Sequence, residues 1–445
     1  MGELFGTDGI RAIAGEYPLD YASVYRLGEA LVSLLREKDL DPEILIGKDT
    51  RESGMWIEQA LFQGIQKAKG KALSAGVIPT SAISYLTRLH EFSAGVVISA
   101  SHNPYLDNGI KIFSSEGVKI SEEWEKTLEE AIISMKGKIL PLSTDISPRF
   151  SFRNDYVEFL KGQLSRAARP RKIKMVIDCS NGASFSIAPQ VFQELGFEII
   201  ALNNCPDGKN INKNCGSLHP GDLARRVVEE RADIGIAYDG DADRAIWVDE
   251  KGNILNGDHT LFVLSQFMKE KGRLKSKFVV ATTMSNLALE KALDERGLKL
   301  RRTKVGDKYV LEEMIRCGSN LGGEQSGHTI FLDDCPTGDG ILTSLKMLEA
   351  MIEYGISLSK MIEGYREYPQ VHRNIEVKEK KAFSQLPEIL ELIEHVKNAL
   401  GDNGRVEVRY SGTEPMARIM VEGKSKEIIE NYSQTLCEAI KKHLG

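Results

Sequence analysis

The sequence predicts an α/β protein of three similar α/β domains followed by a smaller α+β domain at the C-terminus. A chain of 445 residues is too long for one ordinary core, and about three domains are expected at this length. Three segments repeat the order strand, polar loop, helix ended by glycine, and strand, which is typical of βα units with parallel strands. The last segment breaks this pattern and runs strand, helix, strand, strand, helix.

Each α/β domain contains one copy of the repeated plan. The first, about residues 1–150, contains "EILIGKDTRESG" and then the helical "MWIEQALFQGIQKAKG". The second, about 151–250, contains "KMVIDCSNG", the helical "IAPQVFQELG" and the strand "FEIIAL". The third, about 251–367, contains "KFVVATTMSN", the helical "LALEKALDERG" and the strand "LKLRR". We place the first boundary near "KGKILPLSTDISPRF", which carries prolines and has no periodicity.

The α+β domain is expected over about residues 368–445. It contains the strand "VHRNIEVK", a helix over 381–399, the strands "RVEVRYSG" and "ARIMVEG", and a final helix. Four modules that form one site imply a central cleft between them, where ligands commonly bind.

Composition narrows the function classes. The chain is 42% hydrophobic and 27% charged, and its formal net charge of -6 argues against general nucleic-acid binding. No apolar stretch reaches the roughly 18 residues needed to span a bilayer, and "MGELFGTDGIR" lacks the apolar core of a signal peptide. The six cysteines are scattered without a C-x-x-C pair, as suits reduced thiols. We therefore expect a cytoplasmic protein without nucleic-acid or membrane partners.

Three alternating aspartates form the strongest chemical signal, in "YDGDADRAIWVDE". Carboxylates such as those of Asp239, Asp241 and Asp243 are the ligands that a hard divalent cation prefers. An EF-hand loop is excluded, because Arg244 stands where that loop needs glycine and because the flanks "ADIGIAY" and "AIWVD" look like strands. A solvated acidic turn is the other alternative, but three aspartates between apolar strands would repel one another without a cation. We expect a metal site, with Mg²⁺ as the ion.

A second signal is the polar stretch "SASHNP" after an apolar strand, followed by "NGIKIF". Ser101 and His102 lie on the predicted loop, and Lys111 lies inside the second apolar run. Taken alone, the loop is more typical of an ordinary polar turn, and the lysine of an exposed strand face.

Two further loops carry polar groups that can converge. In "GGEQSGH", two glycines bend the chain, and the carboxylate, hydroxyl and imidazole that follow suit sugar hydroxyls. In "RYSGTEPMAR", two arginines and two hydroxyls around a glycine can bind one oxyanion. Each loop alone is also compatible with an ordinary surface loop. No G-x-x-x-x-G-K-[ST] motif appears, so a nucleotide P-loop is not expected.

Together these motifs resemble the α-D-phosphohexomutase family along essentially the whole chain. "FGTDGIR", "SASHNP" with "NGIK", "DGDADR", "GEQSGH" and "SGTEP" occur in the order typical of that family. The glutamine in "GEQSGH", with "NKNCGSLHP" and "KVGDKYV", is similar to the branch that acts on glucosamine phosphates. The resemblance implies three α/β domains with mixed sheets and a smaller C-terminal domain.

The resemblance also implies the reaction. A phosphoserine enzyme would interconvert glucosamine 6-phosphate and glucosamine 1-phosphate through glucosamine 1,6-bisphosphate, with Mg²⁺ as cofactor. Another hexose 1,6-bisphosphate could act as activator. The product would feed UDP-N-acetylglucosamine and cell-wall precursor synthesis. The partner would be a phosphosugar; the oligomeric state stays open, with a homodimer as one option.

Roles carry over to the matching positions. Ser101 would be the phosphorylated serine, and its phosphate with Asp239, Asp241 and Asp243 would hold the metal. The other expected active-site positions are Arg11, His102, Lys111, Arg244 and His328. The expected substrate-binding positions are Asp307, Glu324, Ser326, Arg409, Ser411, Gly412, Thr413 and Arg418. Either Lys111 or His102 could be the general acid and base; we favour Lys111, which we expect to lie among arginines with a lowered pKa.

Three other functions remain to be weighed. A phosphomannomutase/phosphoglucomutase of broad specificity differs mainly in the sugar-binding loop. A serine phosphohydrolase with two zinc ions would need more ligands than eight scattered histidines offer. A sugar-phosphate binding protein without catalysis would be favoured by a broken serine or metal loop, and both are intact.

Overall fold

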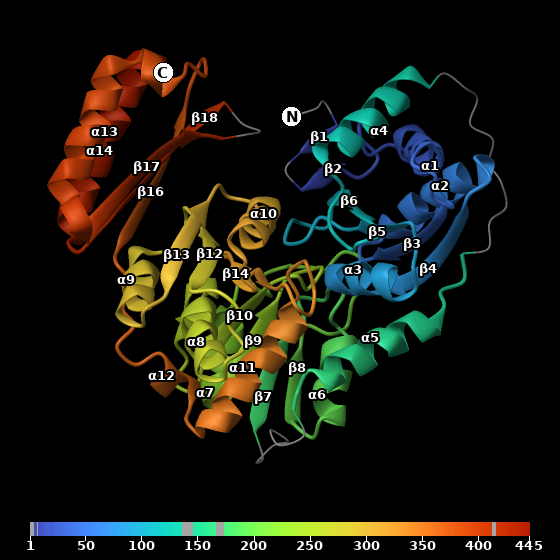
Figure 1. The fold of residues 1–445 in the computed structure, drawn as a ribbon, viewed down its shortest axis with the longest axis horizontal. Coiled ribbons are helices and arrows are strands. Elements are labelled where there is room, and N and C mark those ends of the chain that lie inside the picture. Colours follow the sequence, from blue (N-terminus) through green and yellow to red (C-terminus); the bar gives the residue numbers. More distant parts are fainter. Residues whose placement is uncertain (1–3, 7, 136–145, 166–172, 412–414) are drawn as a thin grey trace. The chain divides into compact units, whose positions relative to one another are not determined.

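The computed structural model describes residues 4–6, 8–135, 146–165, 173–411 and 415–445. The chain forms two compact units, one of Met1–Thr282 with Arg301–Glu363 and one of Thr283–Leu300 with Gly364–Gly445 (Figure 1). None of the helices in the described ranges is both long and apolar enough to cross a membrane. The boundary predicted near residue 150 stays a prediction, and residues 136–145 beside it lie outside the described ranges.

The first sheet has six strands in the order β1-β2-β6-β5-β3-β4. Its strands are β1 (Phe5–Gly6), β2 (Gly9–Ile13), β3 (Glu43–Lys48), β4 (Lys71–Val77), β5 (Ala94–Ile98) and β6 (Asp107–Ser114). The expected parallel pairing is confirmed for β3 with β4 and with β5, whereas β6 runs antiparallel to β2 and β5. The sheet is therefore mixed.

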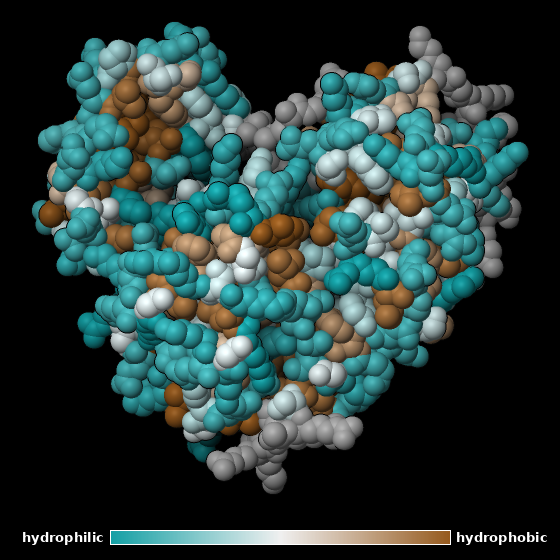
Figure 2. All heavy atoms as spheres, viewed as in Figure 1, coloured by the Kyte–Doolittle hydropathy of each residue, from teal (hydrophilic) through white to brown (hydrophobic). Residues whose placement is uncertain are grey.

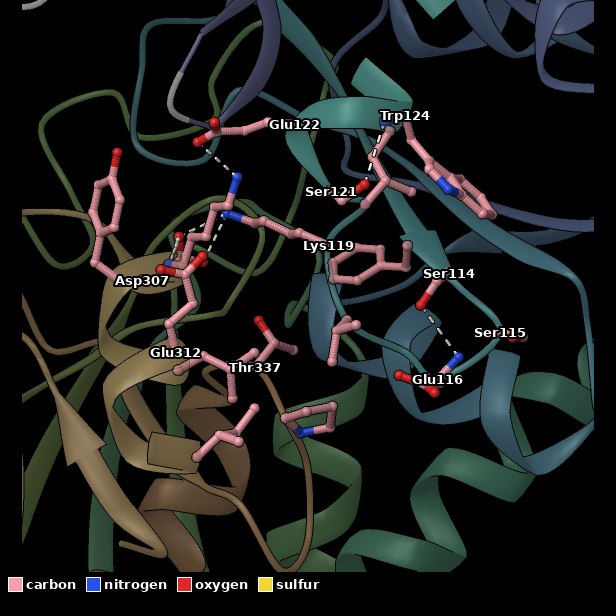
Figure 3. Close-up of a pocket in the computed structure, with 18 of the residues that line it drawn as sticks. Ser114, Ser115, Glu116, Lys119, Ser121, Glu122, Trp124, Asp307, Glu312 and Thr337 are labelled. Carbon is pink, nitrogen blue, oxygen red and sulfur yellow. Dashed lines mark hydrogen bonds and ion pairs between the residues drawn. The ribbon is translucent and has the colours of Figure 1, made fainter. Parts of the chain in front are cut away.

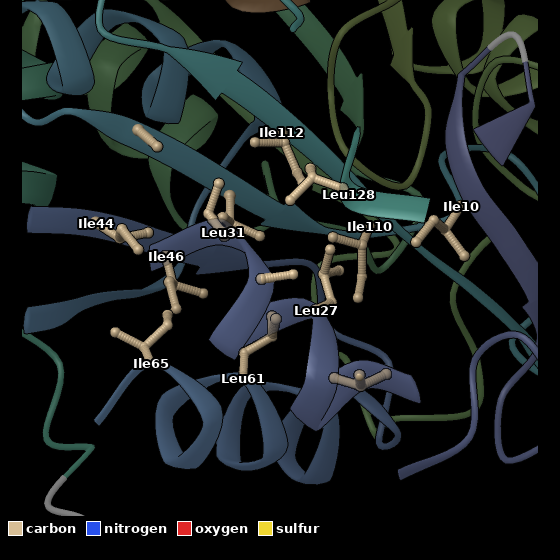
Figure 4. Close-up of a cluster of buried hydrophobic side chains, with 14 of the residues drawn as sticks. Ile10, Leu27, Leu31, Ile44, Ile46, Leu61, Ile65, Ile110, Ile112 and Leu128 are labelled. Carbon is tan, nitrogen blue, oxygen red and sulfur yellow. The ribbon is translucent and has the colours of Figure 1, made fainter. Parts of the chain in front are cut away.

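Helices cover both faces of this sheet. They are α1 (Tyr21–Glu37), α2 (Gly54–Lys67), α3 (Thr80–Leu89) and α4 (Glu122–Ser134). α1, α2 and α4 bury the apolar cluster of Figure 4, in which Leu31 and Leu61 meet Ile46 and Ile110, while α3 lies on the other face (Figure 1). α1 and α2 approach closely at Gly64, where a Cβ atom would lie 2.0 Å from the carbonyl oxygen of Tyr25. Only glycine allows this packing.

The second sheet has the order β11-β10-β9-β7-β8. It consists of β7 (Lys174–Asp178), β8 (Glu198–Leu202), β9 (Ile234–Tyr238), β10 (Ala245–Asp249) and β11 (Ile254–Leu255), with helices α5 (Phe150–Gly162), α6 (Ile187–Glu194) and α7 (Gly221–Glu229). β7 is parallel to β8 and β9, and β10 is antiparallel to β9. The antiparallel turn between β9 and β10 carries the three aspartates.

The third sheet has the order β13-β12-β14-β15. It consists of β12 (Phe278–Thr282), β13 (Lys299–Thr303), β14 (Leu321–Gly323) and β15 (Thr329–Phe331), and its segment contains α8 (Gly257–Glu270), α9 (Leu287–Glu295), α10 (Asp307–Cys317), α11 (Gly340–Tyr354) and α12 (Leu358–Met361). β12 and β14 are parallel, and β14 is antiparallel to β15. The segment Thr283–Leu300, which contains α9, belongs to the second compact unit.

The C-terminal sheet is antiparallel in the order β16-β18-β17, with two long helices packed on its strands. Its elements are β16 (Gln370–Glu376), a 3-10 turn η2 (Phe383–Gln385), α13 (Pro387–Leu400), a second turn η3 (Gly401–Asn403), β17 (Gly404–Tyr410), β18 (Met416–Gly423) and α14 (Lys426–Leu444). The helix expected from 381 begins at Pro387, because proline has no N–H to donate and is favoured in the first helical turn.

Hydrophilic side chains cover most of the face in Figure 2.

Candidate functional site

Three aspartates lie together in the turn between β9 and β10. Asp239, Asp241 and Asp243 are buried, and one carboxylate oxygen from each lies within 4.8 Å of the others. Among the described residues, Oδ1 of Asp241 and Oδ1 of Asp243 are buried without a hydrogen-bond partner. Burial and the two neighbouring carboxylates raise the pKa of Asp239 well above its ordinary value. Orphaned, mutually repelling oxygens in this arrangement fit a divalent cation.

Ser101 reaches this cluster from the first sheet. It lies in the connection between β5 and β6 with a left-handed φ of 50°, and it is 1% exposed. Its Oγ donates a hydrogen bond of 2.6 Å to Oδ2 of Asp239. The Nδ1 atom of His102 lies 3.4 Å from the same hydroxyl. The serine, imidazole and carboxylates expected to act together are therefore in contact.

Lys111 lies among carboxylates with the Arg11 cation also nearby, and the expectation of a lowered pKa is wrong. It points from β6 and is 2% exposed. Its Nζ is 3.0 Å from Oδ2 of Asp241, 3.4 Å from Oδ2 of Asp243 and 3.4 Å from Oδ2 of Asp8. Burial alone would lower the pKa of Lys111, but these carboxylates outweigh it and raise that pKa well above its ordinary value.

His102 is instead the titratable group that the site keeps neutral. Burial, with the cations Arg244 and Arg11 nearby, lowers the pKa of His102 to about 4. Nη1 of Arg244 lies 3.2 Å from Nδ1 of His102, and its Nε is 3.8 Å from Asp243. Arg11 donates to the carbonyl oxygen of Ala100 at 3.4 Å, one residue before the serine. Both arginines thus border the serine loop.

Asp8 and Lys119 also contact the predicted site residues, although neither was predicted from the sequence. Asp8 contacts Arg11, Lys111 and Lys119, and Lys119 forms an ion pair of 2.7 Å with Asp307. A row of alternating charges therefore runs from the aspartate cluster to Asp307 at the start of α10. Asp8 stands inside "FGTDGIR", which offered a signal, whereas nothing in the sequence around Lys119 marked it.

The predicted sugar-binding loop is the turn between β14 and β15. Glu324 accepts a hydrogen bond of 3.1 Å from the backbone N–H of Gly306, and Ser326 is exposed. His328 is 2% exposed, and its Nε2 accepts from the N–H of Gly338 at 3.1 Å and lies 3.7 Å from Oδ2 of Asp307. The glycines expected to bend the chain, Gly322 and Gly323, lie in the extended strand β14.

Gly327 makes the turn instead, with a φ of 100°. A bridge between the backbones of Arg244 and His328 places this hairpin next to the loop of the three aspartates.

The predicted anion site lies in the second compact unit. Arg409 on β17 and Arg418 on β18 are directly opposite each other, and Ser411 is 4% exposed. Burial and the adjacent Arg418 cation lower the pKa of Arg409. Two guanidinium groups side by side favour an anion between them. Gly412 and Thr413 lie outside the described residues.

A cavity of about 910 Å³ lies beside the row of charges (Figure 3). Lys119 and Asp307 line it, together with Trp124 and Glu122, and the ion pair between Lys119 and Asp307 is visible in the close-up. None of the aspartates of the cluster, nor Ser101, lines this cavity. Asp307 is therefore in the wall of this cavity, whereas Ser101 and the aspartate cluster are not.

Models of four domains of one family match the chain in succession. They are described as phosphoglucomutase/phosphomannomutase α/β/α domain I at residues 2–137, domain II at 154–252, domain III at 256–368 and C-terminal domain at 373–439. The four matches span most of the chain.

Similar curated proteins are named phosphoglucosamine mutase. The protein of Koribacter versatilis is 46% identical over 452 residues, covering 100% of this chain and 97% of the relative. That of Thermoanaerobacter sp. is 47% identical over 450 residues, and that of Syntrophus aciditrophicus 44% over 449, each covering 100% of both chains.

Solved structures share the fold. A phosphoglucomutase/phosphomannomutase family protein from Burkholderia thailandensis superposes with a TM-score of 0.80 at 22% identity, covering 98% of this chain and 97% of the other. N-acetylphosphoglucosamine mutase from Aspergillus fumigatus, solved in complex with GlcNAc-6P and magnesium, gives 0.70 at 18% identity, with coverage of 99% and 95%.

Proposed function

Because the chain belongs to the phosphoglucomutase/phosphomannomutase family, we propose that it interconverts glucosamine 6-phosphate and glucosamine 1-phosphate. The observation that carries the proposal is the 2.6 Å contact between the Ser101 hydroxyl and Asp239 within the aspartate cluster. The curated relatives at 44–47% identity support the amino sugar as substrate. Specificity for glucosamine over glucose or mannose is part of the proposal.

The reaction would begin with a phosphoryl group on Ser101. A serine phosphate is a good store, because phosphate monoesters hydrolyse extremely slowly without catalysis. The O1 hydroxyl of glucosamine 6-phosphate attacks the phosphorus, the bond from phosphorus to Ser101 Oγ breaks, and the sugar's proton returns to that oxygen. The 1,6-bisphosphate then reorients and Ser101 Oγ attacks its 6-phosphorus. The bond from that phosphorus to the sugar O6 breaks, the serine's proton passes to O6, and glucosamine 1-phosphate and the phosphorylated serine remain.

Asp239, Asp241 and Asp243, together with the Ser101 phosphate, would hold Mg²⁺. The two orphaned Oδ1 atoms of Asp241 and Asp243 support this assignment. When bound, the ion neutralises charge on the transferring phosphoryl group. The cations that this chain itself supplies, Lys111 and Arg244, hold and orient the anionic group from other sides.

His102 is the group we assign to the proton transfer. It lies 3.4 Å from the Ser101 hydroxyl and is neutral at neutral pH, because its pKa is about 4. A phosphate dianion on Ser101 would raise that pKa, since an opposite charge favours the protonated imidazole. The imidazole can then take the proton from the sugar hydroxyl and return it to Ser101 Oγ. Lys111 would supply positive charge beside the aspartate cluster.

The remaining predicted positions would bind the sugar phosphate. Glu324, Ser326 and Asp307 would bind sugar groups, and His328 would support them from behind. Arg409 and Arg418, with the loop that follows β17, would hold the phosphate that is not reacting. The bisphosphate would then stay bound while it turns around.

The proposal is tested by ³¹P NMR of the purified protein with Mg²⁺, glucosamine 6-phosphate and a trace of a hexose 1,6-bisphosphate. We expect a sugar 1-phosphate signal that appears much faster than in a parallel tube with glucose 6-phosphate. Ser101→Ala should abolish steady turnover, while Ser33→Ala, at an exposed serine on α1, should not. Faster turnover of glucose would move the substrate to hexoses, and release of inorganic phosphate alone would mean a hydrolase.

A further inference from the structure

The segment "NKNCGSLHP" has no role in the reaction above, yet its first residue contacts the serine loop. Asn212 donates both N–H groups of its side chain to backbone carbonyls, at 2.9 Å to Ser101 and 3.1 Å to Asn103. The carbonyl oxygen of Ser101 also approaches the aspartate loop so closely that a Cβ atom at Gly240 would lie 2.5 Å from it. The backbone of Ser101 is therefore held by hydrogen bonds and close packing from the second α/β segment.

Arg51, in the first α/β segment, donates hydrogen bonds to the same loop. Its side chain is fully buried, and Nη2 donates to the carbonyl oxygens of Ser101 at 3.0 Å and Asn103 at 2.9 Å. Nη1 donates to the carbonyl oxygens of Asp107, at 2.9 Å, and Pro104. With Nε bound to a carboxylate, all five N–H groups of the guanidinium are used. Four of the five N–H groups donate to backbone carbonyls within residues 101–107.

Asp49 ties the two sides of Ser101 together. Its Oδ2 accepts from Nε of Arg51 at 2.8 Å and from Oγ of Ser99 at 2.6 Å. Oγ of Ser99 in turn accepts from the backbone N–H of Ser101 at 2.9 Å. The N–H of Ser101 is thus connected to the buried Asp49 carboxylate through Ser99, and its C=O is connected to the same carboxylate through Arg51.

Phosphoryl transfer requires the Ser101 hydroxyl to be held in one position. Ser101 has a left-handed backbone φ of 50°. Residues other than glycine adopt this conformation only when their surroundings enforce it. Its hydroxyl must return to the same place after each transfer, and a misplacement of about 1 Å can cost about a hundredfold in rate. A guanidinium with fixed geometry is suited to hold several carbonyls at once, whereas an ammonium is a flexible point donor.

We propose that Arg51 and Asn212 are positioning residues for phosphoryl transfer, which hold the backbone of the Ser101 loop so that Oγ faces Asp239. This inference rests on the proposed function, because it assigns the loop's geometry to the transfer step. The two residues act through Ser101 and do not themselves touch the substrate.

Two substitutions remove the contacts with matched controls. Arg51→Lys keeps a cation beside Asp49 but cannot reach the same carbonyls. Arg36→Lys is its control, because Arg36 also donates to two backbone carbonyls, of Ala68 and Lys69, on the exposed side of α1.

Asn212→Gly removes the amide and retains a backbone that glycine accepts, since φ is 57° there. Asn214→Gly is its control, with a φ of 55° in the same loop and an exposed side chain.

The measurement is steady-state turnover together with single-turnover transfer from phosphorylated enzyme to glucosamine 6-phosphate by rapid quench. We expect kcat and the single-turnover rate to fall roughly tenfold to a hundredfold in both test variants, with KM changed less than about twofold, and no change in the controls. In the double variant the losses should be less than multiplicative, because both residues hold the same carbonyls.

The outcomes separate this inference from the proposed function. If the unaltered protein transfers no phosphoryl group to glucosamine 6-phosphate, the proposed function fails. If it does, and the folded test variants keep kcat within twofold or change only KM, the positioning role is wrong. Folding is checked by near-ultraviolet circular dichroism; if Arg51→Lys does not fold, Asn212→Gly decides alone.

Discussion

Lys111 is the only residue of the described site whose Nζ bridges three carboxylates, so its removal gives a direct test of the electrostatics. In Lys111→Met the side chain keeps much of its length and loses its charge. Asp241, Asp243 and Asp8, which lie 3.0, 3.4 and 3.4 Å from Nζ, are then left to repel one another. Without a metal ion the folded state should lose stability.

The magnitude follows from these distances. At an effective dielectric constant of about 20, each pair attracts by about 5 kcal/mol, and much of that sum is offset because the buried ammonium no longer has to be desolvated. Breaking a buried pair by removing one partner typically costs 3–5 kcal/mol. We therefore expect a loss of about 4 kcal/mol, which corresponds to a fall of about 5 °C in Tm for a cooperative unit of this size.

Magnesium should reverse part of this loss. Removing the ammonium leaves more negative charge for the cation, so Mg²⁺ should bind the variant more tightly. Each tenfold gain in affinity adds about 1.4 kcal/mol, or about 2 °C, at saturating Mg²⁺. The assay is thermal unfolding of both proteins in EDTA and in saturating Mg²⁺.

Lys48→Met is the matched control. Lys48 is mostly buried and its ammonium pairs with Glu58, so its removal should lower Tm without any added response to Mg²⁺. A Lys111→Met protein that melts within about 1 °C of the unaltered protein in EDTA, or gains no more from Mg²⁺, would refute the reasoning. Turnover that stays near normal would also remove Lys111 from the catalytic charges.

Two further predictions concern groups away from the reaction. Burial lowers the pKa of His259 from 6.5 to about 4, so stability should fall as pH drops from 6.5 to 4, by about 1.4 kcal/mol per pH unit. His259→Gln, which can keep a capping contact at the start of α8, should flatten that slope in urea unfolding at several pH values; an unchanged slope would contradict the assignment. Glu422 is buried and binds both Arg405, at 2.6 Å, and the N–H of Leu287, at 2.7 Å. Glu422→Gln should cost about 3 kcal/mol in the second unit and speed hydrogen exchange at Leu287, whereas Glu407→Gln on the same sheet should do neither.

The strands and the metal-binding turn could be predicted because their signals are local. The apolar run before Asp239 and the one after Arg244 are each strand-length, and carboxylates between two apolar strands have few roles apart from binding a cation. The bend in "GGEQSGH" was assigned to the wrong glycines, because a glycine pair is equally compatible with an extended strand. Which glycine takes a positive φ depends on the hydrogen bonds of the hairpin.

The environment of Lys111 was mispredicted for a different reason. Its neighbours come from residues about 100 and 130 positions away, and no spacing within the sequence reveals which of them face it. The same holds for Arg51, whose guanidinium meets a loop some 50 residues further on, and for Asn212, which meets it from the opposite direction in the chain. Local patterns identify side chains that could react or bind ligands. The pKa values and the orientations of those side chains depend on contacts between distant segments. A prediction of catalytic role from sequence is therefore firmer for the three aspartates, which follow one another in a single turn of the chain, than for Lys111, whose partners Asp8 and Asp241 come from distant segments.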